Sequence, residues 1–273
     1  MSWSLYCDII DKIAPSAEII KLHWIGEPLL NPKICEMIRY AKEKSDAQLF
    51  MSTNASLLKG DLAKEVRTAG LDKIILSIDG ASKTSYERIR VNGKFDEIIS
   101  NIDHFIKSTD SEGGPLCEVK MIQVPDNEHE VNLFRNKWSA FDCVSVNIMW
   151  LCTWAGQLPH LKKLNKYLCP YEPEARVPCS DLWFKMQIAW DGSVYLCCFD
   201  WSGSVSLGNL EKNSLDEIWN SKLISELRAQ HLENNYSGIC KKCNEWARFE
   251  EYEFWYDEEV LKEDPSIIWK SSS

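Results

Sequence analysis

Residues 73–79 read Lys-Ile-Ile-Leu-Ser-Ile-Asp, an apolar run that ends on polar residues. Four further runs of this kind occupy Ile19 to Ile25, Ala47 to Asn54, Leu116 to Val124 and Val144 to Trp150. All are rich in Ile, Leu and Val and apolar on both faces, which is typical of strands in a buried parallel sheet. We therefore expect an α/β unit, a parallel barrel or an open sheet, whose active site lies at the carboxyl ends of its strands.

Helical segments separate the expected strands. Asn31 and Pro32 are a cap and a first-turn proline for one helix, and Gly70 is a stop signal for another. A third segment carries apolar residues at helical spacing from Phe95 to Ile106. This alternation of strand and helix predicts β-α units in series.

Composition and charge narrow the class of protein. The 273 residues are 45% hydrophobic, so the chain can bury a large core, and the formal charge of -10 argues against a nucleic-acid partner. No apolar run approaches the roughly 20 residues of a membrane span, and no basic leader is visible. We expect a cytoplasmic protein with no membrane partner, whose 11 cysteines are reduced or bind metal.

Four cysteines near the end of the chain have the spacing of metal ligands: Cys179, Cys197, Cys240 and Cys243. The pair Asp191-Gly192 predicts a hairpin between the first two, with Cys197 on the return strand. Adjacent strand residues point to opposite faces, so only one of Cys197 and Cys198 can join Cys179, and the spacing from Gly192 favours Cys197. Four soft ligands suit an iron-sulfur cluster or a zinc ion.

The pattern of the sequence divides the chain into four parts. We expect a barrel-like unit over 1–150, an irregular connection over 151–178, a metal domain over 179–245 and a C-terminal helix and tail over 246–273. The connection is rich in proline, and Ser214 with Glu217 forms a capping box that opens a helix in the metal domain. The aromatic and acidic tail is interpreted as a capping helix.

Several motifs at the expected strand ends resemble those of the radical S-adenosylmethionine (SAM) enzymes. They are LHWIGEPLLNP at residues 22–32, STNASLL at 52–58 and SIDG at 77–80 with YERIR at 86–90. The cysteine segment, with LGNL at 207–210 and LDEIW at 215–219, resembles the auxiliary-cluster extension called the SPASM or twitch domain. Together the motifs cover roughly residues 3 to 245 and occur in the family's order.

The resemblance implies a set of SAM-binding residues. Gly26, Glu27 and Pro28 are similar to the family's GGEP segment, which receives the amino group of SAM, with Ile25 in place of the first glycine. Asn54, Ser77 and Arg90 match positions that contact the ribose or the carboxylate of SAM, and Asp79 ends the same strand as Ser77. An arginine fork suits a carboxylate. His23 is interpreted as a core histidine.

One family motif has no counterpart among these residues. Radical SAM chemistry needs a 4Fe-4S cluster held by CxxxCxxC in the first βα loop, and the 273 residues contain no such triplet. The fold expected by resemblance is a partial (β/α)6 barrel lacking its first strand and cluster loop, followed by a small α+β SPASM/twitch domain. The segment from Trp3 to Ile13 corresponds to the helix after that loop. We expect either a piece or late start of a longer enzyme, or a degenerate relative that does not cleave SAM.

The second domain matches a twitch arrangement with one auxiliary 4Fe-4S cluster held by the four cysteines. Phe249 stands where a full SPASM pattern continues with another cysteine. Zinc stays open as the competing metal, because four cysteines suit it too. Cys7 and Cys35 are isolated and are expected to pack as small apolar residues.

The resemblance also implies a function. In its complete form such a protein is expected to use a 5'-deoxyadenosyl radical from SAM as an oxidoreductase, with an electron donor of the flavodoxin or ferredoxin type. One auxiliary cluster favours a small polyol or sugar-like substrate, as opposed to the peptides modified by two-cluster relatives. The alternatives are a non-catalytic protein with a four-cysteine iron-sulfur or zinc site that binds a partner or relays electrons, and a peptide-modifying radical SAM maturase.

Overall fold

A computed structural model of the chain describes residues 1–168 and 176–246. It separates into two compact units. One unit comprises Tyr6–Leu151, here called the sheet unit, and the other comprises Met1–Leu5 together with the chain from Cys152 onward, here called the cysteine unit. The expected C-terminal helix and tail lie outside the described residues, apart from Trp246.

The sheet unit alternates helices with parallel strands. Its helices are α1 (Trp3–Ile13, which begins in the other unit), η1 (Pro28–Leu30), α2 (Ile34–Lys44), α3 (Gly60–Thr68), α4 (Lys83–Ile89), α5 (Phe95–Glu112), η2 (Glu128–Glu130) and α6 (Val131–Trp138). Its strands are β1 (Ile19–Lys21), β2 (Gln48–Thr53), β3 (Lys73–Ser77), β4 (Leu116–Ile122) and β5 (Val144–Met149). The expected β-α order is confirmed.

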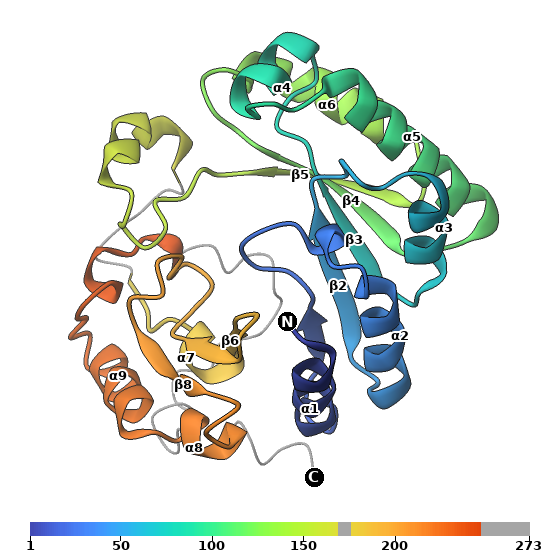
Figure 1. The fold of residues 1–273 in the computed structure, drawn as a ribbon. Coiled ribbons are helices and arrows are strands. Elements are labelled where there is room, and N and C mark those ends of the chain that lie inside the picture. The colour runs from blue at the N-terminus through green and yellow to red at the C-terminus, as the bar shows by residue number, and fades with distance from the viewer. Residues whose placement is uncertain (169–175, 247–273) are drawn as a thin grey trace. The chain divides into compact units, whose positions relative to one another are not determined.

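The five strands form one sheet in the order β1-β2-β3-β4-β5, and every neighbouring pair is parallel. Consecutive strands are therefore neighbours, as in a barrel segment, and Figure 1 shows α2, α3 and α5 along one face of the sheet. Because all strands run the same way, their carboxyl ends lie at one edge, which is where the predicted site residues follow the strands. The partial α/β barrel is confirmed.

The two faces of the sheet differ in chemistry. The helix-covered face is apolar, and its strand residues are almost fully buried: Leu49, Met51, Ile74, Leu76, Cys117, Val119 and Met121. The opposite face alternates with it along each strand and carries polar groups: Ser52, Lys73, Ser77, Glu118, Lys120 and Asn147. The expectation of a sheet apolar on both faces is thus wrong for the second face, which is the interior side of a barrel.

Element boundaries depart from the expected ones in two places. Strand β1 ends at Lys21, and the following residues 22–27 form an irregular loop, because His23 bonds to the backbone of β2 in place of continuing the ladder. Helix α2 begins at Ile34, two residues after Pro32, since the side chain of Asn31 caps the backbone of Lys33 first. Helix α1 spans Trp3–Ile13 as expected.

The cysteine unit contains short elements. Its helices are η3 (Pro159–Tyr167), α7 (Asp181–Phe184), α8 (Leu215–Trp219), α9 (Lys222–Leu232) and η5 (Cys240–Lys242), and its strands are β6 (Gln187–Ile188), β7 (Ser193–Tyr195) and β8 (Ser206–Asn209). The strands form an antiparallel sheet in the order β6-β7-β8. A small core of Leu182, Trp183, Leu196 and Leu227 lies between these elements.

Two local expectations hold in this unit. The Asp191-Gly192 turn joins β6 to β7, and Gly192 has φ +80°, a conformation that residues with a Cβ rarely adopt. Ser214 and Glu217 form both hydrogen bonds of the capping box at the start of α8. The expected first strand of the hairpin is shorter, because Phe184 ends the short helix α7.

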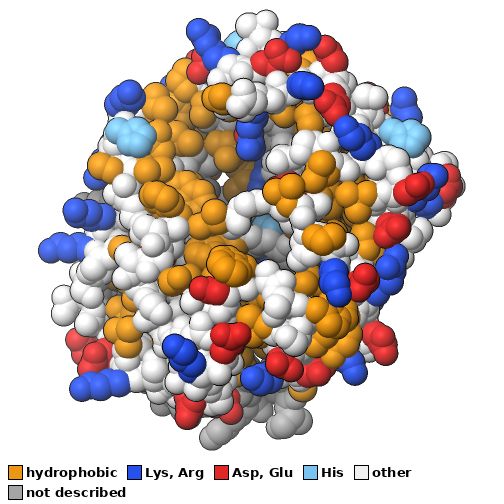
Figure 2. All heavy atoms as spheres, viewed as in Figure 1, with side chains coloured by type: hydrophobic (Ala, Val, Ile, Leu, Met, Phe, Trp, Pro, Cys, Tyr) orange, Lys and Arg blue, Asp and Glu red, His pale blue; other side chains and the backbone are white. Residues whose placement is uncertain are grey.

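Two further features of the described residues are the charge pattern of one face and the length of the helices. On the face seen in Figure 2, Lys and Arg side chains are interspersed with Asp and Glu side chains, which differs from the continuous basic stripe of nucleic-acid-binding proteins. No helix within the described residues combines the length and the apolar character that crossing a membrane requires.

Candidate functional site

Glu27 joins the loop after β1 to the end of β2. Its Oε1 accepts hydrogen bonds from the backbone N–H of Leu29 (3.1 Å) and the hydroxyl of Thr53 (2.7 Å), and its Oε2 accepts one from the N–H of Asn54 (2.8 Å). The structure therefore brings the predicted residues Glu27 and Asn54 together. Thr53, which sequence reasoning missed, lies between them.

The other residues of the GGEP-like segment and Asn54 shape this loop. Gly26 is exposed and has φ +108°, and Pro28 opens η1 directly after Glu27. The side chain of Asn54 accepts the N–H of Ser56 through Oδ1 (2.9 Å) and so fixes the turn after β2. The glycine and the amide thus have local structural functions besides their predicted function.

Ser77 lies on the polar face near the end of β3. Its Oγ is 3.3 Å from Oγ of Ser52 on β2. Ser52 also donates its N–H to Nδ1 of His23 (3.1 Å). Burial, together with the charges of Lys120 and Lys21, lowers the pKa of His23 to about 4, so its ring is neutral near pH 7. The interpretation of His23 as a hydrogen-bonded histidine inside the fold agrees with these contacts.

Asp79 and Arg90 form an ion pair beyond the end of β3. Oδ2 of Asp79 accepts hydrogen bonds from Nε (2.8 Å) and Nη2 (2.6 Å) of Arg90, and its Oδ1 accepts the N–H of Ile122 at the end of β4 (2.9 Å). The side chain of Asp79 is 8% exposed and that of Arg90 is 39% exposed. Both oxygens of Asp79 therefore have protein donors, whereas the side chain of Arg90 is partly exposed.

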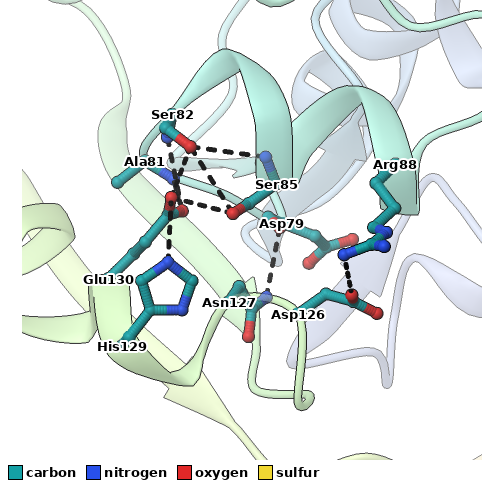
Figure 3. A network of polar contacts seen from close by, with 9 residues as sticks. All are labelled: Asp79, Ala81, Ser82, Ser85, Arg88, Asp126, Asn127, His129 and Glu130. Atoms are coloured by element: carbon teal, nitrogen blue, oxygen red, sulfur yellow. Dashed lines mark hydrogen bonds and ion pairs between the residues drawn. The ribbon is translucent and has the colours of Figure 1, made fainter.

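Asn127, which has no exposed surface, supports this pair from the loop after β4. Its Nδ2 donates to the carbonyl oxygens of Asp79 (3.1 Å) and Ile122 (2.9 Å), and its Oδ1 accepts the N–H of Val124 (2.8 Å). Figure 3 shows Asn127 beside Asp79 at the end of the strand. The ends of β3 and β4 are thereby held together.

A second buried carboxylate, Glu130, holds the turn before α4. It accepts hydrogen bonds from the N–H of Ala81 (2.7 Å), from the hydroxyl of Ser85 (2.8 Å) and from the backbone and hydroxyl of Ser82, as Figure 3 shows. Burial alone raises the pKa of Glu130, but these hydrogen bonds outweigh burial and the net pKa lies below its ordinary value. Sequence reasoning missed Glu130, because nothing local marks a partner more than 40 residues away.

We call Glu27, Asn54, Ser77, Asp79 and Arg90 the strand-end site. Glu27, Asn54, Ser77 and Asp79 lie at or after the carboxyl ends of strands, and Arg90 follows α4; two of the predicted pairs, Glu27 with Asn54 and Asp79 with Arg90, are in contact. The site thus contains one partly exposed arginine side chain and one hydrogen-bonded carboxylate, groups that can bind a carboxylate and an ammonium ion.

The four predicted metal ligands, here called the cysteine site, lie near one another in the cysteine unit. The charges of Cys197 and Cys243 both raise the pKa of Cys179, and the charge of Cys240 raises that of Cys243. Burial is the largest cause at every one of these thiols. It raises the pKa of Cys240 to about 11, so the apoprotein holds neutral thiols that a metal would deprotonate.

The local structure around Cys197 differs from the expected one. Strand β7 ends at Tyr195, so Cys197 and Cys198 lie in the turn that follows, and the alternation of strand faces does not distinguish them. Cys240 and Cys243 flank the single turn of η5, in which the N–H of Cys243 donates to the carbonyl of Cys240 (3.2 Å). The backbone N–H of Glu245 donates to Sγ of Cys243 (3.3 Å).

Four thiols can hold an iron-sulfur cluster or a zinc ion. Within the described ranges no three Cys, His, Asp or Glu side chains are close enough to ligate one metal ion. The electrostatic coupling of Cys179 with Cys197 and Cys243, and of Cys243 with Cys240, brings these thiols into one neighbourhood.

Charged residues that sequence reasoning missed surround these thiols. Three carboxylates, those of Asp181, Asp200 and Glu245, are almost fully buried. His231 accepts the N–H of Cys179 at Nδ1 (3.2 Å), and Arg176 donates to the carbonyl of Cys240 (2.6 Å). They have no motif of their own, and only the fold brings them beside the cysteines.

The sequence patterns of two protein families match the chain. Residues 10–132 match the radical SAM superfamily, and residues 179–244 match SPASM, an iron-sulfur cluster-binding domain. The first range holds the strand-end site and the second holds the cysteine site.

Curated relatives match the chain over different lengths. An uncharacterized protein of Treponema pallidum is 23% identical over 89% of this chain and 69% of its own length. The AdoMet-dependent heme synthase of Methanosarcina barkeri is 30% identical over 34% of this chain, and the probable GTP 3',8-cyclase of Saccharolobus islandicus is 34% identical over 34%. The chain spans 27% and 30% of the length of these two enzymes.

Solved structures show the same fold at low sequence identity. BtrN in complex with AdoMet and 2-DOIA has a TM-score of 0.57 at 17% identity, with 89% of this chain and 80% of that chain covered. The anSMEcpe protein with AdoMet and the Kp18Cys peptide has 0.58 at 14%, with 90% and 79% covered. SuiB of Streptococcus suis bound to the precursor peptide SuiA has 0.55 at 15%, with 84% and 61% covered.

The fold and the two matched ranges are consistent with each other. The sheet unit has a parallel β-α order and lies in the range matched to the first family, and residues 179–244, matched to the second, contain the four predicted metal ligands. The chain belongs to the radical SAM superfamily and carries an iron-sulfur cluster-binding domain of the SPASM type.

Proposed function

We propose that this chain is part of a radical SAM oxidoreductase whose strand-end site binds SAM and whose cysteine site holds one auxiliary 4Fe-4S cluster. The observation that carries the proposal is the pair of preorganised charged groups at the carboxyl ends of neighbouring strands. Glu27 is fixed by Thr53 and Asn54, and Arg90 is fixed by Asp79.

The residues of the strand-end site would divide the parts of SAM among them. Arg90 would receive the carboxylate of the methionine part, because its guanidinium is oriented by Asp79 and partly exposed. Gly26, Glu27 and Pro28 would form the loop at the amino group. Asn54 and Ser77 would face the ribose, which their amide and hydroxyl groups can hydrogen bond. Asp79 is assigned a positioning function, since protein donors occupy both of its oxygens.

In a complete enzyme, a cluster held by a CxxxCxxC triplet would supply one electron, which would cleave bound SAM to methionine and a 5'-deoxyadenosyl radical that could abstract hydrogen from the substrate. The residues of this chain would hold SAM rigidly at the edge of the sheet. They would leave Ser52 and Lys120 on the polar face for the substrate. Preorganised groups of this kind reduce the entropy lost when the reacting atoms meet.

We assign the auxiliary cluster to Cys179, Cys197, Cys240 and Cys243. Its function would be to accept or relay an electron from the oxidised substrate, and a flavodoxin or ferredoxin would serve as the electron donor of the complete protein. Burial of all four thiols supports a cluster shielded from solvent.

The preferred substrate is a small polyol or sugar-like molecule. BtrN, whose structure contains 2-DOIA, has a fold similarity of the same size as the peptide-bound proteins anSMEcpe and SuiB. Peptide modification is therefore the second candidate function. A four-cysteine electron-relay protein without radical chemistry is the third.

The test has two steps, both under anaerobic conditions. The first measures iron, sulfide and zinc per chain, with about four irons and four sulfides expected for one auxiliary cluster. About one zinc without sulfide would contradict the cluster. The second measures SAM binding by equilibrium dialysis with the parent, Arg90→Gln and, as a control, Arg88→Gln, whose side chain pairs with Asp126 at the surface. Loss of binding in Arg90→Gln alone supports the assignment, and equal binding by all three contradicts it.

The substrate class is tested on the complete protein with reductant and SAM. Formation of 5'-deoxyadenosine that increases with polyols or amino sugars supports the preferred function. An increase with cysteine- or lysine-containing peptides alone supports peptide modification. No 5'-deoxyadenosine in the presence of a full set of clusters would leave the electron-relay function.

A further inference from the structure

Arg176 is fixed against the peptide group of one predicted cluster ligand. Its Nη2 donates to the carbonyl oxygen of Cys240 (2.6 Å), and its guanidinium carbon lies 3.5 Å from the centre of the Tyr236 ring. An arginine that is both hydrogen bonded and stacked on an aromatic face has little freedom to turn away. The positive charge of Arg176 therefore has a defined place beside Cys240.

The stack continues to a second predicted ligand. His231 meets the Tyr236 ring edge to face, with centroids 4.9 Å apart and an interplanar angle of 87°. Its Nδ1 accepts the backbone N–H of Cys179 (3.2 Å). Arg176, Tyr236 and His231 thus contact one another in series. Arg176 at one end bonds to the backbone of Cys240, and His231 at the other end bonds to the backbone of Cys179.

Buried carboxylates lie close to the predicted ligands. Asp181 forms an ion pair with Lys185 (2.5 Å), which offsets its charge. Asp200 has no exposed surface and is held by the N–H groups of Ser204 (2.9 Å) and Val205 (2.8 Å), which supply dipoles and no full charge. The backbone N–H of Asp200 donates to the carbonyl of Cys197 (3.2 Å), so this buried negative charge lies close to another predicted ligand.

We propose that Arg176 raises the reduction potential of the auxiliary cluster, with Tyr236 and His231 as the positioning residues that hold it. The proposal depends on the assignment of the cluster to the four cysteines. One-electron reduction makes the cluster more negative, and a fixed positive charge beside Cys240 stabilises the reduced form more than the oxidised form. Without Arg176, the negative charge of the buried Asp200 would no longer be offset by this positive charge. The cluster would then be harder to reduce.

The test compares redox titrations of the reconstituted protein with those of matched variants. Arg176→Gln removes the charge, Arg176→Lys keeps it, and Lys212→Gln removes an equal charge from an exposed turn of the same unit. Spectroscopic titration with dithionite, followed by electron paramagnetic resonance, reads the oxidised-to-reduced ratio at a fixed potential. In Arg176→Gln that ratio should rise about tenfold. This is the effect expected when the cluster loses one nearby unit charge whose interaction with it is partly screened. Arg176→Lys and Lys212→Gln should stay close to the parent.

A second variant keeps the inference testable if Arg176→Gln does not retain iron. Tyr236→Leu leaves the charge of Arg176 but removes its stacking partner, so a smaller shift in the same direction is expected. The inference would be overturned if the titration curve of Arg176→Gln coincided with the parent curve. Where Arg176→Gln lacks iron, the same outcome for Tyr236→Leu would overturn it. A parent protein without iron and sulfide would instead overturn the cluster assignment itself, which the metal analysis detects independently.

Discussion

The strand-end site and the cysteine site differ in how far the protein alone completes them. At the strand-end site both carboxylates already have hydrogen-bond donors: Glu27 has three, and Asp79 has Arg90 and the N–H of Ile122. At the cysteine site burial raises the pKa of four thiols, and buried carboxylates lie nearby. On the proposed assignments, the protein alone forms the first site, whereas a metal completes the second.

The largest expected effect is at the cysteine site. Cys179→Ser removes one of four ligands, so we expect loss of most of the bound iron and sulfide and faster amide hydrogen exchange across residues 176–246. Cys198→Ser is the matched control, because it changes a neighbouring cysteine that is not assigned to the cluster. Iron analysis and hydrogen-exchange mass spectrometry make the measurement. Equal iron loss in both variants would break the contrast between the sites and reopen the choice between Cys197 and Cys198.

At the strand-end site, Asp79→Asn should destabilise the protein by about 3 kcal/mol, because it removes the charge-assisted hydrogen bonds between Arg90 and the buried carboxylate of Asp79. Asp126→Asn is the control. It breaks the exposed pair with Arg88 and should cost less than about 1 kcal/mol. Urea unfolding followed by circular dichroism compares the two variants. Equal free energies of unfolding would show that Asp79 is not a structural anchor.

The pH dependence of the sheet unit depends on His23. Its folded pKa of about 4 lies below the ordinary value of 6.5, so the unfolded chain binds the proton more strongly between these values. The free energy of unfolding should be constant above about pH 6.5 and fall as the pH drops toward 4, by up to about 3 kcal/mol. Denaturant titrations over this range on the parent and on His23→Gln measure the difference. The same slope in the variant would assign the effect to other groups.

The smallest expected effects compare two helix caps, one in each unit. Ser214→Ala removes the capping box of α8, which is exposed, and should cost about 1 kcal/mol. Ser82 caps α4 and also bonds to the buried Glu130, so Ser82→Ala should cost about 2 kcal/mol. Thermal unfolding of both variants ranks them. A larger effect at Ser214 would mean that the polar network in Figure 3 adds little stability.

The sequence allowed the strands and the capping box to be predicted, because each depends on a local pattern of apolar, capping or turn residues, whereas helix α1 was expected from the family resemblance. The order of strands in the sheet follows the same reasoning, since consecutive parallel strands are the simplest product of β-α units. The polar interior face was not predicted. Lys73, Ser77 and Lys120 alternate with apolar residues in runs that are apolar on average, so the runs read as uniformly buried.

The partners of the predicted site residues could not be predicted either. Asn127 lies 48 residues from Asp79, Glu130 lies 45 residues from Ser85, and His231 lies 52 residues from Cys179. Such contacts depend on tertiary packing, which a single sequence does not reveal. The ligand functions of the strand-end residues and of the four cysteines stay predictions, for which the contacts supply a structural reason.

The hydrogen bonds that Glu27 already accepts limit which ligands its carboxylate can still bind. An ionised carboxylate offers about four lone-pair positions, and the chain uses three of them. The position left over is on Oε2, beside the N–H of Asn54. A single N–H of a primary ammonium group can use it, whereas the planar fork of a guanidinium ligand needs both oxygens and would have to displace Leu29, Thr53 or Asn54. Glu27 should therefore discriminate between ligands by the number of hydrogen bonds they demand, in addition to their charge.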